Sequence, residues 1–179
     1  RHKWTTSDGT LKRKAFNIVR DRLGPIRVDA FADQVSSRLP AFASAAPVPG
    51  ALRRDGFALD YTPGDRYCFP PPGQVGRLLA LLRRQKASAV VVAPLWPARP
   101  WFNALAKGAE EVVLLRDAVK HLPGLPRHLA HPKLVAVRWS HDSRNTQGWH
   151  QRFWSAVQRQ QLMPSGPGRG TGGYVTARA

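Results

Sequence analysis

The residues whose types and positions could support chemistry stand at two expected strand ends. Asp29 ends a short apolar segment, and Phe69 is followed by three prolines at 70–72. A carboxylate at a strand end can hold a ribose hydroxyl group, but it can equally cap the turn at 31–33 or pair with a nearby arginine. The proline segment can form a substrate loop, or it can be a stiff connection into a helix that begins near residue 74.

The other reactive groups show no pattern of metal ligands or activated nucleophiles. Cys68 is the only cysteine, which excludes a disulfide framework and a cysteine-based zinc site. We expect its thiol to be buried and unreactive, since no activating partner is evident. His121, His128 and His131 have no carboxylate or thiol at ligand spacing, so a loop facing solvent or RNA is favoured over a metal site. The sequence therefore predicts no metal and no cofactor.

The elements that must position these groups alternate between helix and strand. Apolar residues at helical spacing predict helices at 11–23, 74–87, 101–107 and 149–162. Strands are expected at 26–32, 57–61, 89–94, 111–116 and 134–139. This order predicts an α/β fold with a Rossmann-like, mostly parallel sheet and flanking helices. A ligand cleft would lie at the carboxyl ends of the strands, where Asp29 and the prolines both fall.

The chain divides into three expected segments: a basic arm at 1–10, a single α/β domain at 11–162 and a flexible Gly/Pro/Arg tail at 163–179. Its 179 residues, 42% of them apolar, suffice for one domain with a normal core. The two ends contain too little apolar surface to fold alone, so we expect them to become ordered only against RNA or protein. The chain begins at Arg1 rather than Met, as expected for a fragment, an incompletely traced chain or a product of removal of an organelle-targeting segment.

Charge is the strongest compositional signal. The chain has 28 Lys and Arg against 11 Asp and Glu, which gives a net charge of +17. Such an excess predicts a polyanionic partner, RNA or DNA, because Lys and Arg release counterions from phosphates; an anionic membrane or an acidic protein is the alternative. No apolar run approaches the ~18 residues of a membrane span. The expected nucleic-acid contacts are Arg1, Lys3, Lys12, Arg13, Lys14, Arg77, Arg83, Arg84, Lys86, Arg144, Arg152 and Arg169.

Most of the tryptophans fit a packing role better than a base-stacking role. We expect Trp96, Trp101, Trp139, Trp149 and Trp154 to anchor the core or an interface. Trp4 is the exception, because it lies in an arm with no core to join. The polar turn at 144–148 can contact phosphate or be an ordinary loop.

Five ordered blocks carry a family resemblance: VDAFA at 28–32, LPAF at 39–42, GFALDY at 56–61, YCFPPP at 67–72 and VVAPLWPARPWF at 91–102. Together they resemble the methyltransferase-like region of DIRS-like tyrosine-recombinase retroelements. That region is itself similar to Dam-type DNA adenine-N6 methyltransferases. The resemblance covers about residues 11–116, which is most of the expected domain.

The resemblance implies which residues correspond to the cofactor pocket and the catalytic loop, and it also implies that the catalytic function has been lost. It implies that Asp29 lies near a former S-adenosylmethionine pocket and that Phe69, Pro70, Pro71 and Pro72 form the catalytic loop, which in the family reads Asp/Asn-Pro-Pro-aromatic. Phe69 cannot accept the hydrogen bond that orients the exocyclic amine of an extruded base, and Pro72 cannot stack on that base. No glycine-rich loop precedes Asp29. We therefore expect a degenerate, non-catalytic domain.

The sequence as a whole predicts a basic RNA-binding or structural subunit of a large ribonucleoprotein, with neighbouring proteins as further partners. An organellar, mitochondrial ribosome is the leading specific candidate. Two alternatives stay open: a retroelement-encoded S-adenosylmethionine-dependent DNA adenine methyltransferase, and an auxiliary domain that positions nucleic acid for a reverse transcriptase. A subunit of an organellar ribosome would lie in the organelle matrix, whereas a retroelement-encoded protein would lie in the nucleus or cytoplasm.

Overall fold

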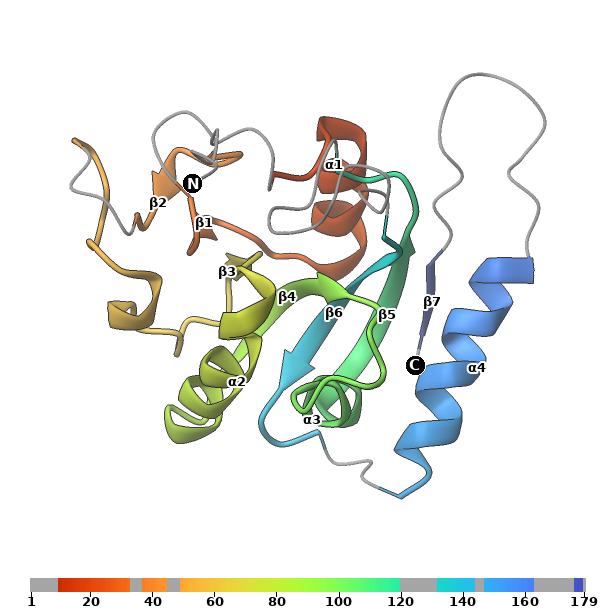
Figure 1. Cartoon of the computed structure of the whole chain (residues 1–179). Coiled ribbons are helices and arrows are strands. Elements are labelled where there is room, and N and C mark those ends of the chain that lie inside the picture. The colour runs from red at the N-terminus through yellow and green to blue at the C-terminus, as the bar shows by residue number, and fades with distance from the viewer. Residues whose placement is uncertain are drawn as a thin grey trace.

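The computed structural model describes residues 10–32, 37–44, 49–119, 132–143, 147–162 and 176–178. Its helices are α1 (Arg13–Leu23), α2 (Val75–Arg84), α3 (Phe102–Gly108) and α4 (Trp149–Leu162), with short 3-10 helices η1 (Gly56–Ala58) and η2 (Pro72–Gln74). Its strands are β1 (Val28–Asp29), β2 (Ala41–Phe42), β3 (Arg66–Cys68), β4 (Ser88–Pro94), β5 (Ala109–Leu115), β6 (Leu134–Ser140) and β7 (Thr176–Arg178) (Figure 1).

The strands form one sheet in the order β2-β1-β3-β4-β6-β5-β7. β1 to β4 pair in parallel, whereas β6 pairs antiparallel with both β4 and β5, and β7 pairs antiparallel with β5. β1 to β5 therefore run in one direction and β6 and β7 in the other. The predicted α/β class is confirmed, with a sheet that is mostly parallel and partly antiparallel.

The strand order reverses between β1 and β3. From β1 the chain moves outward to β2 and then returns to the other side of β1 to form β3. In open α/β sheets a crevice opens at such a reversal, outside the carboxyl ends of the strands. Asp29 and Phe69 stand at the carboxyl ends of these two strands, as predicted.

Helices cover both faces of the sheet, and α1 and α2 lie on opposite sides of it (Figure 1). Val90 and Val92 of β4 pack in the cluster beneath α1, whereas Val91 and Ala93 pack in the cluster beneath α2, α3 and α4. Successive side chains of a strand point to opposite faces, so a strand covered on both faces must be apolar throughout. This explains the uninterrupted apolar run of β4.

Trp139 is confirmed as a core anchor. Its side chain is buried between β6 and α3, and its Nε1 donates a hydrogen bond to the carbonyl oxygen of Ala104 at 3.0 Å. A Cβ added to Gly108 would lie 2.1 Å from the same nitrogen. The indole therefore requires glycine at the end of α3.

Three expectations about the elements are corrected. The strand expected at 57–61 is wrong: the Asp55 side chain accepts a hydrogen bond from Phe57 N at 2.9 Å and starts η1 instead. α1 begins at Arg13 rather than residue 11, because Leu11 forms a β-bridge with Val119. Residues 176–178, expected in a flexible tail, form β7, since the edge of β5 offers free backbone groups for pairing.

Candidate functional site

The carboxylate of Asp29 is buried in the turn that follows β1. Its Oδ1 accepts a hydrogen bond from Phe31 N at 3.3 Å, and its Oδ2 lies 3.5 Å from Arg38 N. Only 3% of the residue is exposed. Both oxygens thus face backbone N–H groups of its own loop, which is the capping arrangement among the alternatives that the sequence left open.

The segment before α1 crosses the carboxyl edge of the sheet. The Arg38 guanidinium donates to the carbonyl oxygen of Leu11 through Nε at 3.1 Å and Nη2 at 2.8 Å. On the other side, Lys12 N donates to the carbonyl oxygen of Ala118 at 2.7 Å, and Lys12 Nζ pairs with Asp117 at 3.0 Å. Leu11, whose side chain is fully buried, therefore links the loop after β1 to the chain after β5.

Phe69 points into the core beneath α1 rather than toward an open cleft. It is 9% exposed and belongs to the same cluster as Leu11 and Tyr67. Phe16 of α1 packs edge-to-face on Tyr67 with ring centroids 5.1 Å apart. Burial, followed by the nearby charge of Asp29, raises the pKa of the Tyr67 hydroxyl well above its ordinary value. Neither side chain offers an ionised acceptor at neutral pH.

The prolines form a strand-to-helix connection. Pro70 is buried, Pro71 is exposed, and Pro72 opens η2, where Gln74 N donates to the carbonyl oxygen of Pro71 at 2.9 Å. η2 leads directly into α2 at Val75. The stiff-connection interpretation accounts for the described geometry of this segment.

Cys68 is buried, as expected. Burial raises the pKa of its thiol, which is hydrogen-bonded to Tyr61. The Tyr61 hydroxyl in turn donates to the carbonyl oxygen of Gly56 at 2.8 Å. A neutral thiol in this setting is a structural group.

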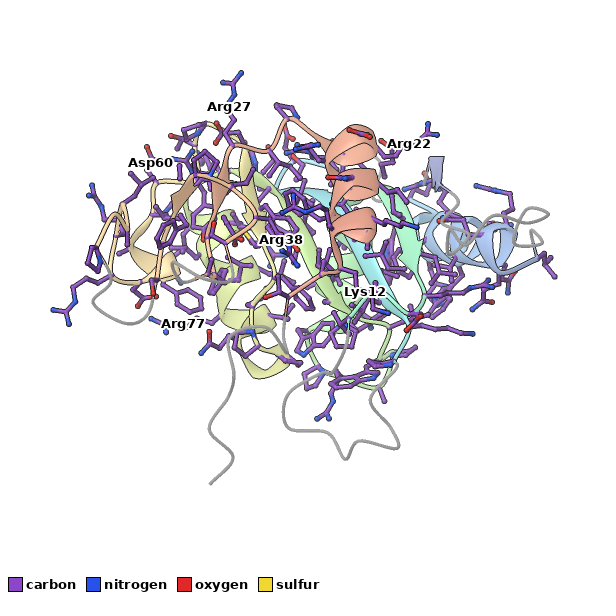
Figure 2. All side chains as sticks on the ribbon, turned by 90° about the horizontal axis from the view of Figure 1, so that it is seen from above. Lys12, Arg22, Arg27, Arg38, Asp60 and Arg77 are labelled. Atoms are coloured by element: carbon purple, nitrogen blue, oxygen red, sulfur yellow. The ribbon has the colours of Figure 1, made fainter. Side chains whose placement is uncertain are left out.

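The exposed face of α1 and the residues at its two ends are strongly basic. Between 12 and 27 the chain has six basic residues and one acidic residue, Asp21. Figure 2 shows Lys12 at one end of α1 and Arg22 at the other, with Arg27 beyond it. Within the described part of the chain, Arg13, Arg22 and Arg27 are exposed and have no carboxylate within 4.0 Å. We call Lys12, Arg13, Lys14, Arg22 and Arg27 the α1 basic face.

A second group of predicted contacts lies on α2, on the opposite side of the sheet. The Arg77 guanidinium stacks on the ring of Phe57 at 3.8 Å from the centroid, and Phe57 packs edge-to-face on Phe31 at 5.4 Å. Arg83, Arg84 and Lys86 are exposed at and just after the last turn of α2. The structure therefore divides the predicted contacts between two faces.

The remaining predicted sites are either structural or undescribed. Arg152 donates to the carbonyl oxygen of Gln147 at the start of α4. Arg1, Lys3, Arg144 and Arg169 lie outside the described residues, as do Trp4 and the three histidines at 121, 128 and 131. Among the residues that are described, no group of His, Cys, Asp or Glu could hold a metal ion, and no helix has the length and apolarity to cross a membrane.

Sequence reasoning missed two exposed basic residues near α1 and one arginine that has a structural role. Arg22 and Arg27 extend the α1 basic face; the helical period could have placed Arg22, but Arg27 follows the Gly24-Pro25 break. Arg138 of β6 is basic but structural: its guanidinium donates to the carbonyl oxygens of Leu23, Pro25 and Gly64. Nothing local in the sequence separates such an arginine from a binding residue.

Comparison with known proteins adds no relative. No protein-family model matches the chain, and no curated protein has a significant match to it.

Proposed function

We propose that this chain is a non-catalytic, basic RNA-binding subunit of a large ribonucleoprotein, with a mitochondrial or other organellar ribosome as the leading candidate. One observation carries the proposal: the α1 basic face lies in a stretch, residues 12–27, that contains six basic residues and one acidic residue. A rigid helix that presents Arg13 and Arg22 to solvent, with no carboxylate of the described residues within 4.0 Å of either, suits the sequence-independent binding of phosphates.

The loss of catalysis is supported by the chemistry of the carboxyl edge. A base-modifying methyltransferase needs a polar acceptor beside the extruded amine. Phe69 supplies an apolar ring that is 9% exposed, and Asp29 is engaged by the backbone of its own loop. These two residues favour a retained scaffold over a working enzyme.

Descent from a methyltransferase-like domain of a retroelement is supported by the sheet. The reversed strand β6 lies between the parallel strands β4 and β5. This mixed sheet is compatible with a Rossmann-like α/β fold, and the proline segment follows β3 at the reversal of strand order. The same features favour, as a second candidate, a retroelement-encoded DNA adenine methyltransferase that uses S-adenosylmethionine.

The test compares two variants of equal charge change. One replaces Arg13, Arg22 and Arg27 with Gln on the α1 basic face; its control replaces Arg54, Lys107 and Lys133, which are exposed elsewhere. Binding of a labelled single-stranded RNA of mixed sequence is measured over a series of salt concentrations. Log affinity falls as log salt rises. We expect the magnitude of this slope to be smaller by about 2 in the α1 variant, at roughly 0.7 for each lost phosphate contact.

Two results would contradict the proposal. Equal weakening by both variants would mean that net charge, and not the α1 basic face, binds RNA. Affinity that is independent of salt would indicate a protein partner. The second candidate is tested separately with labelled S-adenosylmethionine and adenine-containing DNA; methyl transfer that Asp29→Asn abolishes would establish the enzyme instead.

A further inference from the structure

A pocket of about 330 Å³ lies between α2 and α3, on the side of the sheet away from the α1 basic face. It is lined from α2 and η2 on one side and from the start of α3 on the other. This volume is at the small end of the ~300–1,000 Å³ of ligand sites, so one ring system fits it better than a larger ligand. The lining residues are Gly73, Gly76, Leu79, Ala80, Arg83, Pro100, Trp101 and Ala104.

The wall on the α2 side is made open by small residues. A Cβ added to Gly73 would meet nothing within 4 Å, and one added to Gly76 would reach the Cβ of Trp101 at 3.5 Å. Ala80 is exposed in the middle of α2. A flat group can therefore approach the helix backbone closely.

The facing wall contains a half-buried aromatic side chain. Trp101 packs beside Phe102 with ring centroids 6.0 Å apart, and Phe102 stacks on Trp154 of α4 at 5.8 Å with an interplanar angle of 27°. Trp101 is thus packed on one side by Phe102, and the residue also lines the pocket. A partly buried tryptophan in the wall of a pocket is suited to stacking against a planar ring.

The positive charge around the pocket favours a negatively charged ligand. No Asp or Glu lines it, Arg83 does, and residues 66–108 contain seven basic residues and no acidic one. A planar apolar surface beside a guanidinium in a positive segment matches a nucleobase with its phosphate. Bases of duplex RNA are inaccessible to such a pocket, whereas unpaired bases can enter it.

We infer that this pocket receives one unpaired base of single-stranded RNA, stacked on Trp101, with the adjoining phosphate at Arg83. The inference rests on the proposed function and deepens it. Because the pocket and the α1 basic face lie on opposite sides of the sheet, the two surfaces contact different segments of RNA. The protein would then hold a duplex or phosphate-rich segment on one side and a looped-out base on the other.

The experiment compares binding of labelled oligouridine with binding of an oligomer of the same length that carries abasic sugars. Ala80→Leu fills the pocket from an exposed position of α2, and leucine is nearly as good a helix former as alanine. Arg83→Gln removes the lining cation, and Arg84→Gln is its matched control on the same helix turn. Thermal unfolding confirms that each variant is folded.

We expect wild-type protein to prefer oligouridine to the abasic oligomer by at least about fivefold, the effect of stacking one base. Ala80→Leu should abolish that preference and bind the two oligomers equally. Arg83→Gln should weaken the binding of both oligomers, and Arg84→Gln should weaken it less.

The outcomes separate the inference from the proposed function. Equal binding of the two oligomers by wild-type protein, or a preference that survives Ala80→Leu, overturns the pocket inference while RNA binding through the α1 basic face stands. Absence of RNA binding by wild-type protein overturns both. An unchanged preference in Ala80→Leu together with weaker binding in Arg84→Gln would place the contact elsewhere on α2.

Discussion

The two halves of the sheet are built differently. β1, β2 and β3 contain two or three residues each and pair in parallel, whereas β4, β5 and β6 contain seven each and form a long antiparallel ladder around β6, with one register shift in β5 between Ala109 and Glu111. The long strands are buried on both faces over most of β4 and β6 and over the second half of β5. The short strands pair with each other in parallel over only two positions at each contact, and side-chain hydrogen bonds of Asp29 and Arg38 supplement this pairing. Stability is therefore concentrated away from the carboxyl edge where β1 and β3 meet.

Each half of the sheet is bordered by a glutamine whose side chain bonds to backbone groups, and the two glutamines differ in burial. Gln160 of α4 accepts from Leu114 N at 2.7 Å and donates to the carbonyl oxygens of Val112 and Ala156, both at 3.1 Å. Gln85, after α2, accepts from Tyr61 N at 2.7 Å and donates to the carbonyl oxygen of Leu59 at 3.2 Å. The chemistry is the same, but Gln160 is 4% exposed and Gln85 is only partly buried.

The largest effect is expected at Trp139. Trp139→Ala should destabilise the protein by about 3–5 kcal/mol, because it leaves a cavity between β6 and α3 and removes the hydrogen bond to Ala104. The free energy of unfolding is measured in urea. A loss below about 1 kcal/mol would show that the antiparallel half is not the main source of stability.

Gln160→Leu should cost about 1–3 kcal/mol, since it leaves the N–H of Leu114 and the carbonyl of Val112 without their side-chain partner in a dry environment. The same urea titration measures it. A neutral result would mean that β5 re-pairs its backbone locally.

Gln85→Leu should cost about 1 kcal/mol, because water can reach the groups that it leaves unpaired. We expect amide exchange to rise mainly near residues 59–61, with little change in β4 to β6. An effect equal to that of Gln160→Leu would remove the distinction between the two halves.

The smallest effect is expected at Asp60 (Figure 2). Hydrogen bonds from Thr62 N and then from its hydroxyl lower the pKa of the Asp60 carboxyl. A lowered pKa stabilises the folded state above the unfolded-state pKa of about 3.9, and this contribution is lost as pH falls through the folded-state pKa. The stability difference between wild type and Asp60→Ala should therefore be present at neutral pH and disappear in acid. A difference that persists in acid would exclude the carboxylate as its source.

The long elements were predictable from sequence for a physical reason. α4 has the predicted bounds of 149–162, because its apolar stripe follows the helical period, and β4 is recognisable because both of its faces are buried. The short strands depend on partners far along the chain. Strand direction cannot be inferred locally either, so nothing in Leu134–Ser140 signals that β6 runs in reverse.

The candidate site was predictable in part. A strand-end position identified Asp29, and charge identified Arg13, Arg77 and Arg83. Charge gives only the outer face of each helix, however, and not the side of the sheet on which the helix packs. Arg38 and Arg138 show the other limit, because their carbonyl partners lie 27 residues or more away in sequence.

The anchoring of α1 has a consequence for binding. The carbonyl oxygen of Leu11, before the helix, accepts from Arg38 in the loop after β1, and that of Leu23, at its end, accepts from Arg138 of β6, so both ends of the helix are anchored to the rest of the domain. The backbone that presents Arg13 and Arg22 is thus immobilised when the protein folds. In the proposed complex with RNA, binding would restrict only side-chain rotamers, and preorganisation of this kind strengthens affinity without any additional contact.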